Sequence, residues 1–427
     1  MRKYAKISTV NKIKRELYLK KLLDSRHDGM IKVVTGLRRS GKSFLLFNLF
    51  AEELKNQNID ETHIIKINLE DRRNKELRNP DALLAYIDSR LVDKKMHYIL
   101  LDEVQLVDEF EDVLNSYLNI SNADVYVTGS NAKFLSKDVI TEFRGRGKEI
   151  HIFPLTFSEY YSVNQDKTEH DAFLEYITYG GLPKIATEKN IEIKQEYLKN
   201  LFVNTYLIDI KERYKIYKDG DLDELLSVLA SCVGSLTNPR KLADTFKSEK
   251  KSSITQDTIK LYLEYMQDAF LIEKTLRFDV KGKKYIDTPA KYYFNDLGLR
   301  NAKLNFRQTE QTHLMENLIY NELRYRGFSV DVGEVVLNTK NPEGKSCRKT
   351  LEVDFVCNKG FERLYIQSAL SLENLEKKEQ EFRSLLQIKD GFSKIVITNG
   401  SQPTYKTEDG ILVLNLFDFL LEKVKLF

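Results

Sequence analysis

The chain of 427 residues is too long for one compact core, and its 42% hydrophobic residues suffice to build two or three domains. Its 67 lysines and arginines nearly balance its 64 aspartates and glutamates, so the net charge of +3 excludes a strongly polybasic mode of partner binding. No apolar stretch approaches the roughly 18 residues of a membrane span, and no apolar run follows the basic N-terminus. We expect a soluble multidomain protein, neither secreted nor inserted in a membrane.

The cysteines and the charged residues indicate further which kind of protein this is. Cys232, Cys347 and Cys357 are scattered without C-x-x-C spacing, which supports neither a disulfide framework nor a zinc site. Charged residues make up 31% of the chain, with 7 prolines and no tryptophan, which indicates long helices with solvated faces. The expected location is the reducing cytoplasm.

The first distinctive stretch is a phosphate-binding motif. Residues 11–25 predict a packing helix, and residues 33–44 then combine a strand end, a glycine-bounded loop and a helix start. The loop contains G-x4-G-K-S, in which backbone amides and the helix N-terminus would surround a β-phosphate, while Lys42 would lie near the β- and γ-oxygens and Ser43 would hold Mg²⁺. The predicted nucleotide contacts are Gly36, Leu37, Arg38, Arg39, Ser40, Gly41, Lys42, Ser43 and Phe44.

Such a motif alone also fits an ordinary loop before a helix. The neighbouring segments therefore decide whether the loop binds phosphate. Residues 61–70 predict a strand covered on both faces, and residues 80–93 predict a helix. The apolar strand 97–101 is then followed by Asp102 and Glu103, and Asp102 lies 60 residues after Lys42. Asp102 would orient the water shell of Mg²⁺, and Glu103 would polarise the attacking water. A solvated strand end is the alternative, but the ordered set favours a nucleotide hydrolase.

Two further segments offer polar groups to this site. Residues 123–131 predict a short strand that ends in small polar residues. Ser130 or Asn131 could contact the γ-phosphate or the attacking water, or Ser130 could simply cap a helix over 132–136. Arg144 and Arg146 precede another strand, 149–153, and an arginine here could stabilise developing phosphate charge in cis or from a neighbouring subunit. Ordinary ion pairs explain both arginines equally well.

The motifs in their order carry a resemblance to a known family. They are Gly-Leu-Arg-Arg-Ser-Gly-Lys-Ser (36–43), Ile-Asn-Leu-Glu-Asp (67–71), Leu-Leu-Asp-Glu-Val-Gln (100–105), Thr-Gly-Ser-Asn-Ala (128–132), Gly-Arg (145–146), Phe-Pro-Leu-Thr-Phe-Ser-Glu-Tyr (153–160), Tyr-Gly-Gly-Leu-Pro (179–183), Asp-Ile-Lys-Glu-Arg-Tyr (209–214) and Tyr-Tyr-Phe-Asn-Asp-Leu-Gly-Leu-Arg (292–300). The chain resembles a prokaryotic family of AAA-type ATPases related to archaeal origin-recognition ATPases. The resemblance covers nearly the whole chain.

The resemblance implies ATP as the nucleotide. It also implies phosphate, Mg²⁺ and catalytic roles for Lys42, Asp102 and Glu103, while it assigns no arginine finger. Members of this family are mostly of unknown cellular function, and some are linked to defence or toxin–antitoxin settings.

The middle of the chain predicts helices and then a winged helix. Helical spacing recurs from about residue 165, and two short helices, 240–246 and 255–269, precede a basic hairpin that contains Lys281–Lys284. Residues 252–260 could enter a major groove with the hairpin on phosphates. Winged helices also mediate protein contacts, and a lysine-rich turn is often only solvated, so DNA and protein partners both stay open.

The C-terminal part resembles a restriction-endonuclease core that has lost residues. A helical Glu316, a strand Asp354 and a following strand come in the expected order, but Gln367-Ser368-Ala369 stands where active members have (D/E)-x-K. We therefore expect a domain that does not cleave. Glu316 and Asp354 would be structural remnants or a weak metal site.

The sequence thus predicts an α/β protein with three parts: a P-loop ATPase domain with a parallel sheet covered by helices on both faces (1–165), a helical and winged-helix region (166–300) and a nuclease-like domain (301–427). The predicted catalytic residues are Glu103, Asp102, Lys42, Asn131 and Arg146, and the predicted metal ligands are Ser43 and Asp102. ATP and Mg²⁺ are the expected cofactors. The predicted function is an ATPase that moves its later domains, and the alternative is a nucleotide-gated switch for DNA or protein with negligible turnover. A protein client or self-association stays open, and no membrane partner is expected.

Overall fold

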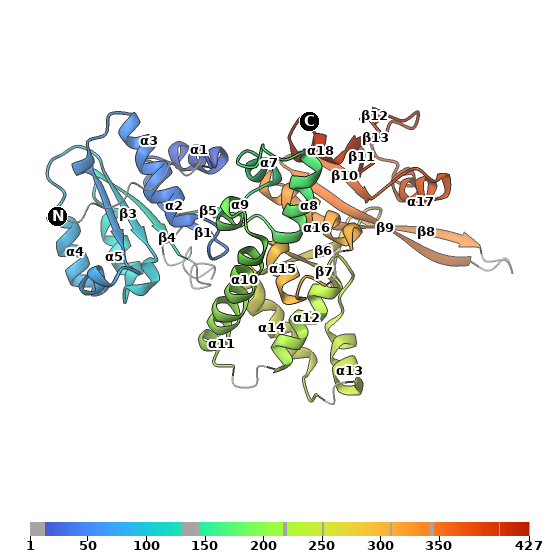
Figure 1. Cartoon of the computed structure of the whole chain (residues 1–427), viewed down its shortest axis with the longest axis horizontal. Helices are drawn as coiled ribbons and strands as arrows, with labels where there is room; N and C mark the ends of the chain where they lie inside the picture. Colours follow the sequence, from blue (N-terminus) through green and yellow to red (C-terminus); the bar gives the residue numbers. More distant parts are fainter. Residues whose placement is uncertain are drawn as a thin grey trace. The chain divides into compact units, whose positions relative to one another are not determined.

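The computed structural model describes residues 13–129, 143, 145–216, 220–249, 252–307, 310–340, 346–400 and 402–426. The chain folds into two compact units, Met1–Pro154 and Leu155–Phe427 (Figure 1). The three-part division at residues 165 and 300 stays a prediction. Among the described helices, none is both long enough and apolar enough to cross a lipid bilayer.

The first unit contains a five-stranded parallel sheet in the order β2-β3-β4-β1-β5. Its strands are β1 (Ile31–Gly36), β2 (Ile64–Asn68), β3 (His97–Asp102), β4 (Ala123–Thr128) and β5 (Gly147–Ile152). Every residue of β1 and β3 is buried, so both faces of the sheet are covered, as the near-continuous apolar runs in the sequence predict. The α/β fold class with a parallel sheet is confirmed.

Helices complete the first unit. They are α1 (Glu16–Asp24), α2 (Lys42–Phe44), η1 (Leu45–Phe50), α3 (Ala51–Asn56), η2 (Glu61–His63), η3 (Arg72–Arg78), α4 (Pro80–Asp88), η4 (Val104–Leu106) and α5 (Phe110–Tyr117). The elements α2, η1 and α3 follow one another without a break, so one helical segment leads away from the phosphate loop. Its apolar residues Leu45, Leu46, Leu49 and Phe50 are buried, which anchors the helix start against the core.

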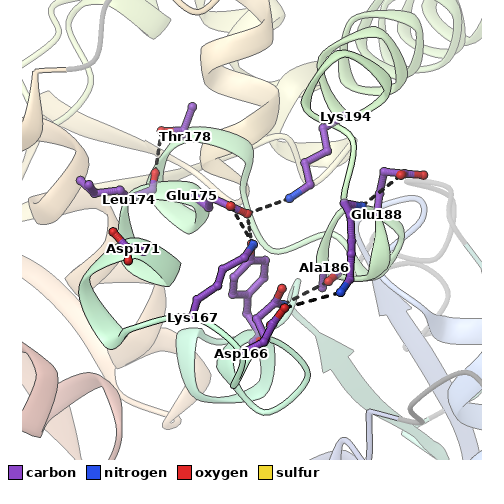
Figure 2. Close-up of polar contacts among 12 residues, drawn as sticks. Asp166, Lys167, Asp171, Leu174, Glu175, Thr178, Ala186, Glu188 and Lys194 are labelled. Atoms are coloured by element: carbon purple, nitrogen blue, oxygen red, sulfur yellow. Dashed lines mark hydrogen bonds and ion pairs between the residues drawn. The ribbon is translucent and has the colours of Figure 1, made fainter.

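The second unit begins with helices. They are α7 (Phe157–Tyr161), α8 (Glu169–Tyr179), α9 (Pro183–Thr187), α10 (Ile191–Leu201), η6 (Phe202–Leu207), α11 (Ile208–Tyr214), α12 (Gly220–Ser231), α13 (Pro239–Glu249), α14 (Gln256–Asp268), α15 (Leu297–Lys303), α16 (Gln311–Tyr325), α17 (Leu375–Leu386) and α18 (Leu416–Leu420). A charged cluster joins α8 to α10: Glu175 accepts hydrogen bonds from Lys167 at 2.7 Å and from the buried Lys194 at 2.9 Å (Figure 2). Partial burial alone would raise the pKa of Glu175, but the two lysines outweigh it and lower the pKa to about 2.

An eight-stranded mixed sheet follows, in the order β12-β13-β11-β10-β9-β8-β6-β7. Its strands are β6 (Ile272–Asp279), β7 (Lys284–Phe294), β8 (Ser329–Lys340), β9 (Ser346–Lys359), β10 (Glu362–Ala369), β11 (Ser393–Thr398), β12 (Tyr405–Lys406) and β13 (Leu412–Asn415). The helices α13 and α14 and the hairpin β6–β7 occur where the sequence predicts two helices and a hairpin. The hairpin is also part of the C-terminal sheet, because β6 pairs with β8, so one sheet extends across the predicted boundary at residue 300. The winged-helix interpretation stays a prediction.

Two glycine-containing motifs of the family resemblance meet in this unit. The Asp296 carboxylate accepts backbone hydrogen bonds from Gly181 at 2.8 Å and from Leu299 at 3.0 Å. A Cβ on Gly180, whose φ is +79°, would lie 2.3 Å from Asp296, and one on Gly298 would lie 2.0 Å from the Tyr179 carbonyl oxygen. The close approach of the two segments therefore requires glycine at both positions.

Candidate nucleotide-binding site

The carboxyl ends of β1, β3 and β4 lie at one edge of the first sheet, because the strands are parallel. The phosphate loop follows β1, Asp102 ends β3 and Thr128 ends β4. Since β4 lies between the other two strands, Thr128 stands between the loop and Asp102. The fold therefore gathers, at one edge, groups that are far apart in the sequence.

Two glycines shape the loop itself. Gly36 has a φ of +136°, and a Cβ there would lie 2.2 Å from the carbonyl oxygen of Ile152, so only glycine fits. Gly41 has a φ of +98° and immediately precedes the helix start at Lys42. The loop thus turns directly into a helix N-terminus, where free backbone N–H groups favour an anion.

Lys42 is folded back onto this loop. Its Nζ donates hydrogen bonds to the carbonyl oxygens of Gly36 at 3.0 Å and Leu37 at 3.1 Å, and only 5% of the residue is exposed. Burial lowers the pKa of Lys42 to about 8, although the carboxylates of Glu103 and Asp102 favour its charged form. The ammonium group is therefore held at the loop by carbonyl oxygens that a phosphate could replace.

Asp102 is buried beside two hydroxyl groups. Thr128 Oγ1 donates to its Oδ1 at 2.5 Å, and the Ser43 hydroxyl also hydrogen-bonds the carboxylate. Burial raises the pKa of Asp102 despite these hydrogen bonds. Carboxylate and hydroxyl oxygens are the hard donors that Mg²⁺ prefers, so Ser43 and Asp102 fit the metal that this class of site uses, and a cation here would also offset the buried charge.

Glu103 has a constrained backbone. Its φ is +56°, which is uncommon for a residue with a side chain and places it in a strained region that often marks a functional position. Its N–H donates to Thr128 Oγ1 at 3.1 Å, and the side-chain amide of Gln105 donates to its carboxylate. Backbone and side chain are both fixed at the edge of the sheet.

Comparison with known protein families identifies the domain that carries these residues. Residues 28–161 match the family described as AAA domain, and residues 170–310 match a domain of unknown function, DUF8612. The first unit contains an AAA domain of the P-loop class.

Relatives extend the likeness over nearly the whole chain. An uncharacterized protein of Haemophilus influenzae is 33% identical over 96% of this chain and 99% of its own length. The chain belongs to the same family as that protein. The uncharacterized protein MJ1544 of Methanocaldococcus jannaschii is 32% identical over 83% of this chain and 77% of its own length.

Solved structures resemble the chain more distantly. A Walker-type ATPase of Pyrococcus abyssi matches 69% of this chain and 96% of its own, at 13% identity and a TM-score of 0.47. The ORC1 protein of Aeropyrum pernix in complex with DNA matches 68% of this chain and 91% of its own, at 12% identity and a TM-score of 0.30.

The other residues that the sequence predicts to contact the nucleotide differ in their exposure and their neighbours. Arg38 lies 3.9 Å from the Glu70 carboxylate, Arg39 is exposed with a φ of +67°, and Phe44 is 43% exposed. The side chain of Ser40 is buried. Asn131 lies outside the described residues, as do Ser130 and Arg144, so their predicted roles stay predictions.

Arg146 lies away from the cluster. Its carbonyl oxygen accepts from the Ile31 N–H at 2.9 Å, so the residue precedes β5 at the amino end of the sheet, whereas the phosphate loop follows the carboxyl end of β1. The length of β1 is about 20 Å at 3.3 Å per residue, which is beyond the reach of an arginine side chain. The alternative of a finger acting in cis is therefore not favoured, and an action from a neighbouring subunit stays a prediction.

Sequence reasoning missed two supporting residues. Arg15 donates to the Ser40 carbonyl oxygen at 3.2 Å and to the Phe153 carbonyl oxygen at 2.6 Å, and so ties the AAA phosphate loop to the end of the unit. Thr128 bridges Asp102 and Glu103. A polar residue at the end of a buried strand was the available signal for Thr128, but its importance depends on the strand order.

The nuclease-like residues form a cluster of their own in the second unit. The buried Lys291 on β7 pairs with Glu316 at 2.9 Å and with Glu352 at 2.7 Å. Asp354 accepts a hydrogen bond from the Ser368 N–H at 2.7 Å, and burial followed by repulsion from Glu316 raises its pKa. The lysine neutralises part of the cluster, which agrees with a structural role, and the degenerate nuclease interpretation stays a prediction.

Proposed function

We propose that the protein binds ATP with Mg²⁺ at the AAA site and hydrolyses it to ADP and phosphate. One observation carries the proposal: Ser43, Asp102, Thr128 and Glu103 form a continuous set of hydrogen-bonded groups beside Lys42 at the loop. These are the residue types that phosphoryl transfer to water requires, and they lie at or after the carboxyl ends of three strands of one sheet.

Each residue has a distinct part in this proposal. The loop amides and Lys42 bind the β- and γ-phosphates, and Ser43 and Asp102 hold Mg²⁺. The metal supplies positive charge that offsets the charge of the phosphates. Glu103 accepts a hydrogen bond from the attacking water, and Thr128 positions both acids.

The nucleotide state would then act on the second unit. We infer that binding and hydrolysis change how the helical region and the C-terminal sheet are presented to a client. A protein with negligible turnover, in which ATP serves only as an ordering ligand, is the competing candidate. It would show slow hydrolysis together with a large increase in thermal stability on ATP binding.

The experiment compares nucleotide binding of the full chain with that of Lys42→Ala, by calorimetry with ATP and Mg²⁺. We expect an affinity loss of at least ~100-fold, because the variant removes the buried charge that the loop holds at the phosphate position. Lys55→Ala is the matched control, since Lys55 lies in α3 and pairs with the exposed Glu61. Equal affinities for the wild type and Lys42→Ala would refute binding at this loop.

DNA is a second candidate ligand, supported by the turn between β6 and β7. Lys281, Lys283 and Lys284 are exposed there, and within the described part of the chain none of them forms an ion pair that would neutralise it. Exposed Arg348 and Lys349 lie on the neighbouring hairpin of β8 and β9. Exposed cations on two hairpins of one sheet suit the phosphates of the DNA backbone.

The test of this candidate is a titration of the protein with duplex DNA at several salt concentrations. The affinity should fall steeply with salt, and the triple replacement of the three turn lysines by alanine should weaken binding and reduce the salt slope by about 3. Replacement of Lys14, Lys20 and Lys55 by alanine gives a control of equal charge. Absence of binding at low salt would exclude DNA as a ligand of this turn.

A further inference from the structure

A second group of potential ligands lies in the first unit, outside the nucleotide site. His63, Asp93 and His97 each offer one ligand atom, and these atoms all lie within 4.8 Å of one another. His63 directly precedes β2, His97 opens β3, and these strands pair from Ile64 and Tyr98 onward, so the two imidazoles stand side by side. The rings are 4.6 Å apart between centroids.

Asp93 is brought to the histidines by the connection between α4 and β3. Asn122 holds this connection through a hydrogen bond from Nδ2 to the Asp93 carbonyl oxygen at 2.9 Å, and the Asn122 carbonyl oxygen accepts from His97 N–H at 2.8 Å. Both Asp93 carboxylate oxygens lie 3.1 Å from His63 Nε2. The cluster is thus assembled from two segments of the chain, one around His63 and one that runs from Asp93 to His97.

Both ring nitrogens of His63 have polar neighbours. Nδ1 lies 3.3 Å from Thr62 Oγ1, which itself donates to the Asp60 carboxylate at 2.6 Å. Nε2 lies 3.1 Å from both Asp93 carboxylate oxygens, which is close to the separation of two ligand atoms on one metal ion.

His97 is available as a third ligand. The residue is fully buried, its Nδ1 has no hydrogen-bond partner among the described residues, and its Nε2 accepts only a long bond of 3.3 Å from the Val92 N–H. Asp93, by contrast, has a side chain that is 41% exposed, which gives an ion an entry path and leaves room for water as a further ligand.

We propose that His63, Asp93 and His97 bind a divalent transition-metal ion, with Zn²⁺ the best match. Two imidazoles and one carboxylate suit Zn²⁺ and its neighbours and disfavour Mg²⁺ and Ca²⁺, which take oxygen ligands. Ligand atoms around tetrahedral Zn²⁺ are roughly 3.3 Å apart, so the His63–Asp93 separation already fits and the widest pair must close by about 1.5 Å at most. Because His63 Nε2 and Asp93 already fit, this closing must come from the pairs that include His97.

The site is separate from the nucleotide site. His97 and Asp102 are the first and last residues of β3, so the metal lies about 17 Å along the strand from the predicted Mg²⁺ ligands. Its expected effect is to fasten the α4–β3 connection to the amino ends of two core strands. Its failure would leave the proposed ATPase function untouched.

The experiment uses untagged full-length protein freed of metal by a chelator. Calorimetry with ZnCl₂ should show one tight site per chain, and Co²⁺ in place of Zn²⁺ should give the visible absorption of a site with few ligands. Asp93→Asn, which keeps the shape of an exposed side chain, and His63→Gln should each weaken Zn²⁺ binding by at least ~100-fold, the upper end of the loss seen for outer-shell partners. His170→Gln, an exposed histidine in α8, is the control and should bind as the wild type does.

Two results would overturn the metal site. One is absence of Zn²⁺ uptake by the wild type, which would mean that His63 and Asp93 form only a hydrogen bond. The other is uptake that survives both Asp93→Asn and His63→Gln, which would place the metal elsewhere. Because Asp93→Asn changes an exposed side chain, its circular dichroism and thermal transition without metal should match the wild type and show that the variant is folded.

Discussion

Thr128 donates a hydrogen bond of 2.5 Å to Asp102 across the boundary between β4 and β3. The same hydroxyl oxygen accepts the Glu103 N–H at 3.1 Å, so a single side chain holds one acid and the backbone of the next. Thr128 is fully buried, which keeps water from competing for these bonds. Its removal therefore tests whether the two acids must be positioned for turnover.

We predict that Thr128→Val lowers kcat by about 10- to 100-fold. The valine leaves Asp102 and the Glu103 N–H without their shared partner, which should also cost about 1–3 kcal/mol of stability. Nucleotide affinity measured by calorimetry should change by less than about threefold, because the phosphate loop is untouched. Thr128→Ser keeps the hydroxyl and should retain most of the activity, and equal kcat values for the valine and serine variants would argue against a positioning role.

Nucleotide binding should take up a proton at alkaline pH. The pKa of Lys42 is lowered to about 8 by burial in the free protein, and neighbouring phosphates would raise it because they favour the charged ammonium. Binding at pH 8.5 should therefore be accompanied by proton uptake, while binding at pH 6.5 should not. Calorimetry in two buffers that differ in ionisation enthalpy measures the uptake directly.

Lys42→Arg provides the control for proton uptake, since arginine stays charged throughout this range. Any nucleotide binding that this variant retains should occur without Lys42-linked uptake. Uptake of equal size in Lys42→Arg and the wild type would assign the proton to another group.

The Glu175 cluster makes a prediction about stability. Glu175→Gln would leave the buried ammonium of Lys194 without a counter-charge, and we expect a loss of about 3 kcal/mol in the free energy of unfolding (Figure 2). Lys167→Met should cost less than about 1 kcal/mol, because Lys167 is partly exposed and Lys194 keeps its partner. Chemical denaturation at pH 7 compares the two variants.

The effect of Glu175 should also depend on pH with a definite sign. The pKa of Glu175 is about 2 in the folded protein, below its ordinary 4.5, so its stabilisation is complete above pH 4.5 and is lost as the pH falls from there toward 2. The difference between the wild type and Glu175→Gln should shrink over this range. A difference that stays constant down to pH 2.5 would show that packing, not charge, accounts for the loss.

The sequence predicted the first unit well because its signals are local. Apolar runs placed β1 to β5 within a few residues of their observed positions, and the loop spacing with Asp102 indicated the site. Strand order is not local, however. Only the arrangement β2-β3-β4-β1-β5 shows that Thr128 stands between the loop and Asp102. The same holds for the position of Arg146 at the opposite edge.

The second unit was harder to predict from the sequence, because its strand pairing is also not local. A basic hairpin after two helices predicts a wing, but no local pattern shows that β6 pairs with β8, which begins 50 residues after β6 ends. The family motifs around Gly180 and Asp296 were recognisable in the sequence, but the sequence offered no physical reason for these residues. Their contact supplies one, since the buried carboxylate binds backbone N–H groups that glycine alone lets come close.

The most direct test of the central claim is the release of phosphate from ATP by the wild type and Glu103→Gln, with Mg²⁺ and with nucleotide affinity measured on the same samples. We predict Mg²⁺-dependent turnover by the wild type, and in Glu103→Gln an unchanged affinity with kcat lowered by about 10²- to 10⁴-fold, because the amide cannot take the proton of the attacking water. Hydrolysis of ATP by Glu103→Gln at the wild-type rate would contradict the catalytic role of Glu103. A wild type that binds ATP without measurable turnover would contradict the ATPase itself.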